Sequence, residues 1–453
     1  MARQSGGFHA GRPETPAPPA PGLAARVAAA RAVAEALTSS RPLDERLAAD
    51  PTLRKGGLDA RDRALARSIA TVALRRLGTI RKALARRLEK GVPKRGALEW
   101  TLIVAAAQIL FLDTPDHAAV DLAVKAARAE AASAPFAALA NAVLRAIARD
   151  RDEILASSDP LDDDTPAWLA QRWRSTYGES VVRAIALAHR SEPTLDLSVK
   201  SDAFGWAERL QGIVLPTGSV RLDTHAPVVE LQGYGDGEWW VQDAAAAMPA
   251  RLLRPSPGMR VVDLCAAPGG KAAELAAAGV DLTTVDRSAE RLKLLAANFE
   301  RLRLTSEIVV ADALVFDAPP FDAVLLDAPC SATGTIRRHP DVAWIKRPGD
   351  LMALVKLQAE LLDKAIALAR PGGAIVYCVC SLEPEESEAQ ITALLRRNPD
   401  VRRLAVTPEE IGGTDECLSP AGDLRTLPCH LWGDNPRRSG LDGFFAARLV
   451  KTG

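Results

Sequence analysis

The stretch Asp263-Leu-Cys-Ala-Ala-Pro-Gly-Gly-Lys271 decides the fold of the second half of this chain. The apolar run from Met259 to Val262 before it predicts a buried strand, and the Ala- and Leu-rich residues from Lys271 to Ala278 predict a helix. Where a strand turns into a helix, the first N–H groups of the helix can face a ligand, and glycine lets that ligand approach the main chain. Two glycines alone are more often an ordinary turn, so the residues downstream must decide between a turn and a ligand site.

Predicted strands and helices alternate from Arg260 onward, which predicts a doubly wound, largely parallel α/β sheet of the Rossmann-like type. The predicted strands are Arg260–Leu264, Leu282–Asp286, Ile308–Ala311, Ala323–Asp327 and Ala374–Val379. The predicted helices are Lys271–Ala278, Ala289–Arg303, Asp350–Ala369 and Glu385–Arg397. Ligands of such sheets bind at the carboxyl ends of the strands. The polar residues that the sequence places at those ends are Asp263, Asp286, Asp312, Asp327 and Cys380.

Two further stretches each place a cysteine close to the end of a predicted strand. One is Asp327-Ala-Pro-Cys-Ser-Ala-Thr-Gly334, which contains Cys330, and the other is Cys380-Ser-Leu-Glu-Pro-Glu-Glu386. Two thiols beside a nucleotide-type site indicate nucleophilic catalysis. A free thiol is more often a buried structural group. We expect that structural role for the cysteines without such a context, which are Cys265, Cys378, Cys417 and Cys429.

The composition limits the other possibilities. The chain has 453 residues, 48% of them hydrophobic and 25% charged, which is typical of a soluble globular protein of two or three domains. Lys plus Arg and Asp plus Glu both total 57, so the net charge gives no argument for a nucleic-acid partner. The sequence shows no apolar run of about eighteen residues and no signal-like leader, and we expect a cytoplasmic location without a membrane partner. Its six cysteines predict neither a disulfide framework nor a zinc site, because no paired C-x-x-C spacing occurs.

The first third of the chain predicts a helical domain behind a short tail. Residues 1–22 are rich in Pro, Gly and Ala and predict a flexible tail. From Ala24 to Arg149 the apolar residues recur at helical spacing, which predicts an all-α bundle of six or seven helices with Leu98 to Leu112 as a central one. Basic residues crowd the stretch from Arg61 to Arg95. Such a stretch is either a solvated helix face or an RNA contact, and both interpretations remain open.

A third region separates the helical bundle from the sheet. Asp159 to Asp164 predicts an acidic, Pro-bounded linker. Leu195 to Val199 and Gly212 to Leu215 predict short strands, and we expect residues 160–250 to connect the domains or to position the substrate. A later segment, Arg337 to Pro340 with Trp344, predicts a loop that either contacts phosphates and bases or is simply exposed.

The second half of the chain resembles the Sun-type RNA 5-methylcytosine methyltransferases. The motifs that carry this resemblance are D-x-C-A-A-P-G-G-K (263–271), D-A-P-C-S-x-T-G (327–334), C-S-L-x-P-E-E (380–386) and D-G-F-F-x-A-R-L (442–449). The chain departs from the pattern at Val379, where the family usually has Thr, and at Ser387-Glu388, where it usually has Asn-Glu. Neither change removes a reacting group. Cys378 creates an ambiguity over the nucleophile, which we resolve in favour of Cys380 because Ser-Leu-x-Pro-Glu-Glu follows it.

The helical region is similar to the NusB family of RNA-binding domains. The motifs T-P-D-H-A-A-V (114–120) and N-A-V-L-R (141–145), preceded by Phe136, carry this similarity over about residues 60–149. The predicted fold is therefore an α plus α/β multidomain protein. Its predicted parts are a flexible tail (1–22), a NusB-like RNA-binding domain (23–150), a connecting or substrate-positioning region (160–250) and a Rossmann-like methyltransferase domain (251–453).

The resemblance implies methyl transfer from S-adenosylmethionine to carbon 5 of an RNA cytosine. It implies that Cys380 is the nucleophile, that Cys330 assists product release, and that Asp327 lies near the base and also in the cofactor site. Asp286, about twenty residues after the loop, suits the ribose hydroxyls, and Asp312 suits the adenine amine. The expected cofactor-binding residues are Cys265, Ala266, Ala267, Pro268, Gly269, Gly270, Lys271, Asp286, Asp312 and Asp327. The expected partner is small-subunit (16S) ribosomal RNA, or an assembling small-subunit particle, and no metal is expected.

Three other classes of protein compete with this interpretation. A DNA cytosine methyltransferase also uses a thiolate, but its nucleophile lies in the first Pro-Cys motif alone. A non-catalytic RNA-binding assembly or antitermination-type factor could retain the fold without turnover, but Asp327, Cys330 and Cys380 are all intact. A small-molecule methyltransferase of the same fold needs neither a second cysteine nor an RNA-type domain.

Overall fold

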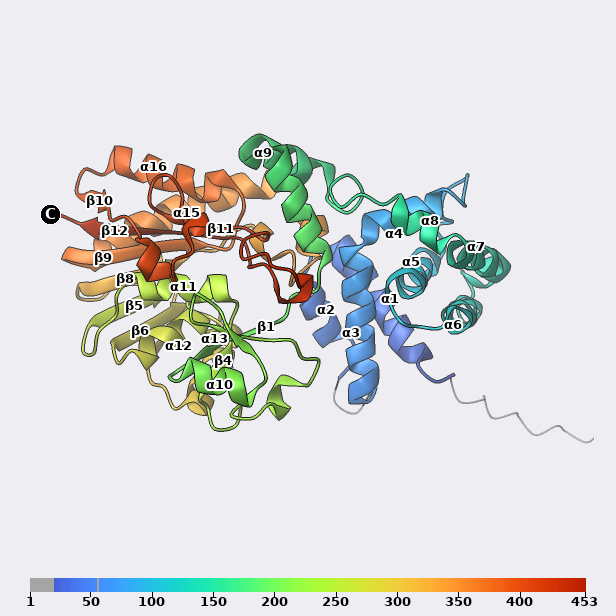
Figure 1. Cartoon of the computed structure of the whole chain (residues 1–453), viewed down its shortest axis with the longest axis horizontal. Coiled ribbons are helices and arrows are strands. Elements are labelled where there is room, and N and C mark those ends of the chain that lie inside the picture. The colour runs from blue at the N-terminus through green and yellow to red at the C-terminus, as the bar shows by residue number, and fades with distance from the viewer. Residues whose placement is uncertain (1–19, 55–56) are drawn as a thin grey trace, which may run out of the picture.

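The computed structural model describes residues 20–54 and 57–453 (Figure 1). A helical body forms the N-terminal part, a sheet-containing body forms the C-terminal part, and the helix α9 (Ala167–Arg190) lies between them (Figure 1). The predicted tail, residues 1–22, lies outside the described residues except for its last three positions.

The helical body contains eight α-helices within the described residues. They are α1 (Leu23–Ser39), α2 (Leu43–Ala49), α3 (Ala60–Arg75), α4 (Leu77–Ala85), α5 (Leu98–Phe111), α6 (Asp116–Ala129), α7 (Ala137–Arg149) and α8 (Arg151–Ala156). Helix α5 is central, as the sequence predicted. It is apolar on all sides and nearly all of its residues are buried, which is the pattern of a core helix. The predicted six or seven helices up to Arg149 correspond to α1 to α7.

The region between the two bodies has a small sheet and a core of its own. After α9, in which Gly178 interrupts the helical geometry with a φ of 79°, the strands form an antiparallel sheet in the order β2-β3-β1-β4. Its elements are β1 (Leu195–Val199), α10 (Ala203–Arg209), β2 (Ile213–Val214), β3 (Val220–Leu222), β4 (Trp239–Val241) and the following α11 (Ala244–Leu252). Trp206 and Trp239 lie in the core of this sheet.

The C-terminal body is built on an eight-stranded sheet in the order β10-β12-β9-β8-β5-β6-β7, with β11 paired to β12. The five strands that the sequence predicted are all present and parallel. They are β5 (Arg260–Leu264), β6 (Asp281–Asp286), β7 (Glu307–Val310), β8 (Phe321–Asp327) and β9 (Ala369–Val379). The carboxyl ends of neighbouring β8 and β9 carry the two cysteine motifs.

Helices cover both faces of this sheet (Figure 1). Helices α11, α12 (Gly270–Ala277) and α13 (Ala289–Leu302) pack on one face. Helices α15 (Pro348–Leu368) and α16 (Glu388–Arg397) pack on the other. Successive strand residues point to opposite faces, so Val261 of β5 joins the first core and Val262 joins the second. The sheet is therefore doubly wound, as the alternation of elements predicted.

Three antiparallel strands complete the sheet, and these were not predicted from the sequence. They are β10 (Val401–Arg403), β11 (Leu424–Thr426) and β12 (Phe444–Lys451). Strand β12 lies between β9 and β10, and its first six residues are all buried. A strand buried on both faces shows no alternation of apolar and polar residues, which explains why the D-G-F-F-x-A-R-L motif gave no strand signal.

Three further features concern the described part of the chain as a whole. None of its helices combines the length and the apolar character that a membrane crossing requires. Within residues 20–54 and 57–453, no group of three or more His, Cys, Asp or Glu side chains is placed to hold a metal ion. All six cysteines are free thiols.

Candidate active site

The loop between β5 and α12 has the backbone geometry of a ligand cradle. Cys265 and Gly269 adopt positive φ angles of 65° and 104°, and α12 begins at Gly270. A Cβ atom at Gly269 would lie 2.9 Å from Cγ of Leu295, so only glycine fits there. The Asp286 carboxylate accepts hydrogen bonds from the Ala267 N–H (3.1 Å) and from the Ser288 N–H (2.8 Å). The end of β6 therefore fixes the loop that the sequence singled out.

The loop lies in a cluster of charges that is rich in carboxylates. Burial raises the pKa of Asp263 well above its usual range, and the nearby carboxylates of Asp327 and Asp286 raise it further. The Oδ1 atom of Asp263 is buried without a hydrogen-bond partner. Lys271 places its Nζ 2.8 Å from Oδ2 of Asp327, and Arg291 places its Nη1 3.6 Å from Oδ2 of Asp286. Two of the three carboxylates are therefore paired with cations, whereas Asp263, whose raised pKa favours the protonated form, keeps an oxygen that can accept a hydrogen bond from a ligand.

Lys271 is held more specifically than its place in the glycine loop implied. Its Nζ lies 4.6 Å from the centroid of the Phe444 ring, so the D-G-F-F motif on β12 contacts the loop on β5. Burial alone would lower the pKa of Lys271, but the charge and hydrogen bond of Asp327, together with the nearby thiols of Cys378 and Cys380, outweigh burial and raise it. The ion pair therefore joins a residue assigned to the cofactor with a residue assigned to the base. Asp312, by contrast, is exposed beyond β7, and its Oδ1 accepts the Leu314 N–H.

The two motif cysteines meet at the ends of β8 and β9. The Sγ atoms of Cys330 and Cys380 lie 3.4 Å apart, and both side chains are partly exposed. The hydrogen bond with Cys380, together with burial, raises the pKa of Cys330 well above its usual range. Cys330 therefore keeps its proton at neutral pH, next to a second sulfur that can accept a hydrogen bond from it.

The other cysteines lack this arrangement. Cys378 is fully buried in the sheet core, and its Sγ is 3.5 Å from Oδ1 of Asp327. Burial raises the pKa of Cys378 well above its usual range, and burial raises the pKa of Cys265 to about 12. Cys417 lies 3.5 Å from Nδ1 of His430 in the segment between β10 and β12. Neutral, buried thiols are poor nucleophiles, so only Cys330 and Cys380 combine a shared geometry with partial exposure.

Helix α9 holds the Cys380 motif from outside the sheet. The Arg172 guanidinium pairs with Glu383 and Glu385 at 2.6 Å each. The Trp173 indole N–H donates to Oε1 of Glu383 (2.9 Å), and the Tyr177 hydroxyl donates to the Leu382 carbonyl (2.5 Å). Neither Arg172 nor these contacts was singled out from the sequence, because the partners are about 200 residues apart and nothing local marks them.

The loop after Cys330 is structural, which corrects both interpretations of it. Arg337 is buried and donates to the Ser439 carbonyl (3.0 Å). Arg338 pairs with Asp243 (2.5 Å) and with Asp442 (3.2 Å). These guanidinium groups are committed to the protein, so they are neither phosphate ligands nor an exposed loop. Isolated Arg residues in a loop look the same in the sequence whether they face solvent or buried carboxylates.

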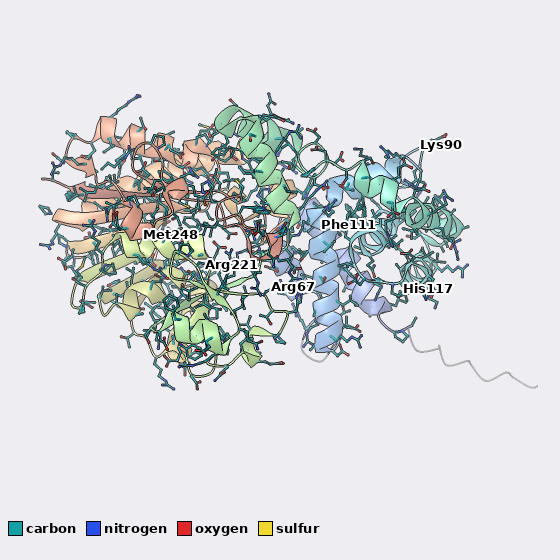
Figure 2. The ribbon with its side chains drawn as sticks, in the orientation of Figure 1. Arg67, Lys90, Phe111, His117, Arg221 and Met248 are labelled. Atoms are coloured by element: carbon teal, nitrogen blue, oxygen red, sulfur yellow. The ribbon has the colours of Figure 1, made fainter. Side chains whose placement is uncertain are left out.

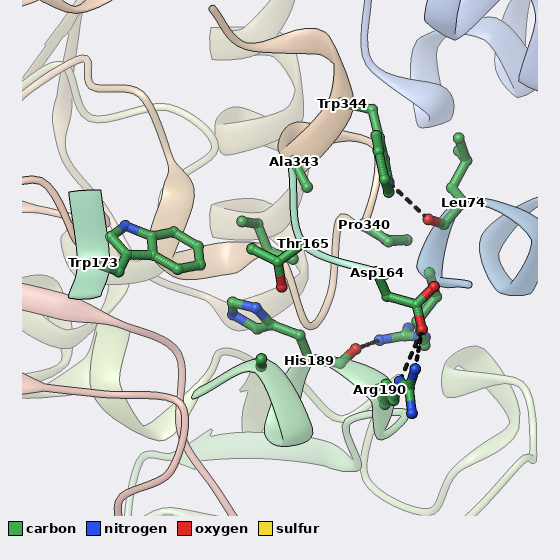
Figure 3. Close-up of a pocket in the computed structure, with 12 residues that line it drawn as sticks. Leu74, Asp164, Thr165, Trp173, His189, Arg190, Pro340, Ala343 and Trp344 are labelled. Carbon is green, nitrogen blue, oxygen red and sulfur yellow. Dashed lines mark hydrogen bonds and ion pairs between the residues drawn. The ribbon is translucent and has the colours of Figure 1, made fainter. Parts of the chain in front are cut away.

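The same loop is the contact point of the helical body. Trp344, in the short helix α14 (Val342–Ile345), donates its indole N–H to the Leu74 carbonyl (2.8 Å). Arg75 is buried and donates to the carbonyls of Arg337 (2.7 Å), His189 (3.1 Å) and Ser191 (3.1 Å). Figure 3 shows this junction around a cavity of about 10 Å³, which is too small for a ligand. Burial lowers the pKa of His189 to about 3, so this side chain is neutral.

The basic stretch of the helical body is only partly available to RNA. Arg76 pairs with Asp164 (3.0 Å) and Lys82 with Asp163 (2.7 Å), so the acidic segment predicted as a linker is docked on α3 and α4. Arg67 lies on the side that faces the sheet, whereas Lys90 lies at the far end of the helical body (Figure 2). The exposed basic residues of the stretch include Arg61, Arg81, Lys90, Lys94 and Arg95.

Comparison with known proteins identifies the family. Residues 250–450 match the family described as 16S rRNA methyltransferase RsmB/F, and residues 23–149 match the NusB family. Ribosomal RNA small subunit methyltransferase B from Xylella fastidiosa (strain Temecula1) is 38% identical over 95% of this chain and 98% of its own length. The chain belongs to the ribosomal RNA small subunit methyltransferase B family. It is therefore a member of a family of RNA methyltransferases, as the two sets of motifs predicted.

Further comparisons agree with this membership. The protein of the same name from Xanthomonas campestris is 37% identical over 95% of this chain and 98% of its own length. A solved methyltransferase homolog protein from Pyrococcus horikoshii is 26% identical, covers 66% of this chain and 98% of its own chain, and superposes with a TM-score of 0.52. The predicted fold, a helical NusB domain followed by a sheet-based methyltransferase domain, is confirmed. Family membership favours an RNA methyltransferase over the DNA and small-molecule enzymes considered from the sequence.

Proposed function

We propose that this protein transfers a methyl group from S-adenosylmethionine to carbon 5 of a cytosine in small-subunit (16S) ribosomal RNA. The observation that carries the proposal is the 3.4 Å separation of the Cys330 and Cys380 sulfur atoms beside the glycine loop of β5. Methyl transfer to an amine needs no thiol, whereas carbon 5 of cytosine must first be activated by a nucleophile. The names of the related proteins support the choice of small-subunit RNA.

The residues at the end of β5 and β6 fit the proposed cofactor. S-adenosylmethionine carries a sulfonium and an ammonium group, and it supplies the methyl group of the reaction. The unpartnered Asp263 oxygen can accept a hydrogen bond from the ammonium group, and the nearby Asp327 and Asp286 carboxylates place negative charge beside it. The main chain of Cys265–Lys271 would hold the cofactor, with Asp286 on the ribose hydroxyls and Asp312 on the adenine amine. A side chain in place of Gly269 would clash with Leu295 and disrupt this part of the proposed cofactor site.

Cys380 is the proposed nucleophile. Its thiolate adds to carbon 6 of the cytosine, which forms a carbon–sulfur bond and converts the ring into an enamine that is nucleophilic at carbon 5. After methylation, a water molecule takes the proton from carbon 5, the electrons of that C–H bond re-form the C5–C6 double bond, and the carbon–sulfur bond breaks to return the thiolate of Cys380. The base must be unstacked for this addition, so a single-stranded or loop cytosine is the expected target.

Three further residues complete the proposed site. Cys330, whose pKa is raised, holds a proton beside Cys380 and assists release of the product. Asp327 hydrogen-bonds the Watson–Crick edge of the base and stabilises the adduct, and Lys271 holds that carboxylate in place at 2.8 Å. The two thiols therefore have different roles: Cys380 forms the bond to the base, and Cys330 holds a proton beside it.

The proposed division of labour follows the parts of the chain. Residues 23–150 contact RNA through the exposed part of the basic stretch, residues 160–250 position the substrate, and residues 251–453 carry out the transfer. The docking of the helical body on the loop after Cys330 supports this division, because it holds an RNA-binding domain next to the reacting residues.

The test uses unmodified small-subunit RNA, labelled S-adenosylmethionine and the full chain. Wild type, Cys380→Ala, Cys330→Ala and the control Cys378→Ala are compared for 5-methylcytosine formed and for protein–RNA adducts on denaturing gels. We expect Cys380→Ala to abolish transfer, Cys330→Ala to accumulate a covalent adduct, and Cys378→Ala to do neither. An adduct with Cys380→Ala instead would exchange the roles of the two thiols. Cofactor binding without methylation by the wild type would favour a non-catalytic assembly factor.

A further inference from the structure

A single buried carboxylate, that of Glu386, lies between the two cysteine turns. Glu386 ends the short 3-10 helix Pro384–Glu386 and is fully buried. No Lys, Arg or His side chain forms a salt bridge with it in the part of the chain that the structure describes. A carboxylate buried without a cation is costly unless hydrogen-bond donors surround it. The donors around this one all belong to elements that carry or support the cysteines.

The residue after each cysteine donates to the same carboxylate. Ser331, which follows Cys330, donates its N–H to Oε1 (2.8 Å) and its hydroxyl to Oε2 (2.5 Å). Ser381, which follows Cys380, donates its hydroxyl to Oε2 (2.5 Å). The two serine hydroxyls are themselves 3.0 Å apart. The chain on either side of the sulfur pair is therefore tied to one group.

Helix α15 holds the carboxylate of Glu386, and strand β9 holds its main chain. The Gln358 amide donates to Oε1 of Glu386 (3.0 Å) and to the Pro329 carbonyl (2.9 Å), just before Cys330. The Tyr377 hydroxyl donates to the Glu386 carbonyl (2.5 Å). Every donor is buried or nearly so, which makes these hydrogen bonds strong and their loss expensive.

The charge of Glu386 also acts on the Cys330 thiol. Beyond the hydrogen bond with Cys380 and burial, the negative charge of Glu386 contributes to raising the pKa of Cys330. A negative group near a thiol opposes formation of a second negative charge, so the proton stays on Cys330.

We propose that Glu386 is a positioning residue for the reaction, which sets the separation of the two sulfur atoms and keeps the proton on Cys330. The inference rests on the proposed function for the roles of the thiols, but the geometry of the pair can be measured without RNA or cofactor. Two substitutions separate its two effects. Glu386→Gln keeps the shape of the side chain and removes the charge, whereas Glu386→Asp keeps the charge and shortens the reach.

The first measurement is cross-linking of the two thiols in the full chain with dibromobimane, a short reagent that bridges neighbouring thiols. Mass spectrometry of the digest reports the Cys330–Cys380 product, and thermal unfolding reports folding. We expect a high yield from the wild type and at least a severalfold lower yield from Glu386→Asp. The matched control is Glu385→Gln, which removes the neighbouring, half-buried carboxylate that pairs with Arg172, and it should cross-link like the wild type. Equal yields from wild type and Glu386→Asp would overturn the proposal.

The second measurement is the rate of methyl transfer against pH. A displacement of about 1 Å can cost about 100-fold, so both Glu386 variants should lose about 10- to 100-fold in kcat with little change in KM for the RNA. In Glu386→Gln the loss of activity at alkaline pH should begin at a lower pH than in Glu386→Asp, because only the Gln variant lacks the charge. Identical pH profiles for the two variants would overturn the role assigned to the charge.

Two results need their own interpretation: no methyl transfer by the wild type, and failure of Glu386→Gln to fold. If the wild type transfers no methyl group but the cross-linking yields differ as expected, the proposed function fails and the positioning of the sulfur pair by Glu386 stands. If Glu386→Gln does not fold, Ser381→Ala removes one of the hydroxyl contacts without touching the carboxylate. It should lower the cross-linking yield in the same direction, and an unchanged yield would overturn the proposal.

Discussion

The glycine loop and the cysteine pair lie side by side but are built in different ways. The loop is nine consecutive residues, and its shape comes from its own main chain and from Asp286 at the end of the next strand. The cysteine pair joins residues 50 positions apart, and its geometry depends on side chains of α9, α15 and the turn before α16. Cofactor binding by the loop should therefore be sensitive to substitutions within the loop. The geometry of the cysteine pair should be sensitive to substitutions far from it in the sequence.

The largest expected effect is that of Cys380→Ala, which should disable the cysteine pair and leave the glycine loop unchanged. Removal of the nucleophile should lower methyl transfer by at least about a thousandfold, because no other group supplies the bond to carbon 6. Cofactor affinity, measured by calorimetry, should stay within about twofold of the wild type, since the loop is independent of the thiol. A parallel loss of cofactor affinity would show that the two regions are a single unit.

Gly269→Val tests the opposite case, in which the glycine loop is damaged and the cysteine pair is left intact. Valine at a φ of 104° is strained, and its Cβ would meet Leu295 at 2.9 Å. Backbone strain of about 1–3 kcal/mol corresponds to a loss of cofactor affinity of roughly 10- to 100-fold. The yield of the Cys330–Cys380 cross-link should not change. A lower yield would contradict the local character of the loop.

Arg172→Met tests whether a distant residue reaches the cysteine pair. The substitution leaves the fully buried Glu383 with the Trp173 indole but without its guanidinium partner. Because Arg172 is partly exposed, we expect a loss of about 1–2 kcal/mol in the free energy of unfolding, measured with denaturant. Methyl transfer should fall about tenfold with cofactor affinity unchanged. Arg174→Met, on the exposed side of the same helix, serves as the control.

The smallest expected effect is a dependence of stability on pH that comes from Asp442. Burial, with Asp243 nearby, raises the pKa of Asp442 to about 7. The folded chain then binds a proton that the unfolded chain releases near pH 4, so stability falls as the pH rises through 7. We expect the wild type to lose about 1 kcal/mol between pH 6 and pH 8 relative to Asp442→Asn, measured by denaturant unfolding. The same slope in both proteins would contradict the assignment.

The predictions from the sequence were correct for features formed by consecutive residues and incomplete for features built by distant ones. The glycine loop, the five parallel strands and the central helix α5 were predicted correctly, because each is defined by consecutive residues with a clear periodicity. Strand β12 was missed because it is buried on both faces. Arg337 and Arg338 were assigned to RNA or to solvent, and they serve buried partners instead.

For the cysteine pair, the sequence predicted Cys330 and Cys380 but not the side chains that hold them. Glu386 stands in the motif beside Glu385, and the sequence offers no way to tell that Glu386 is fully buried and Glu385 only half-buried. The contacts of Arg172 and Gln358 depend on how distant elements pack. Their identification requires the three-dimensional arrangement.

The joint at Arg75 has a consequence for how this family can diverge. The guanidinium reaches three main-chain carbonyls, at His189, Ser191 and Arg337. Carbonyl oxygens survive every substitution at those positions, so the receiving surface can drift in sequence while the joint persists. All three contacts of Arg75 come from its Nη1 nitrogen, so this one atom ties the helical body to α9 and to the loop after Cys330. Trp344 acts in the opposite direction, because its indole N–H binds the Leu74 carbonyl, so each body offers a side chain to the main chain of the other.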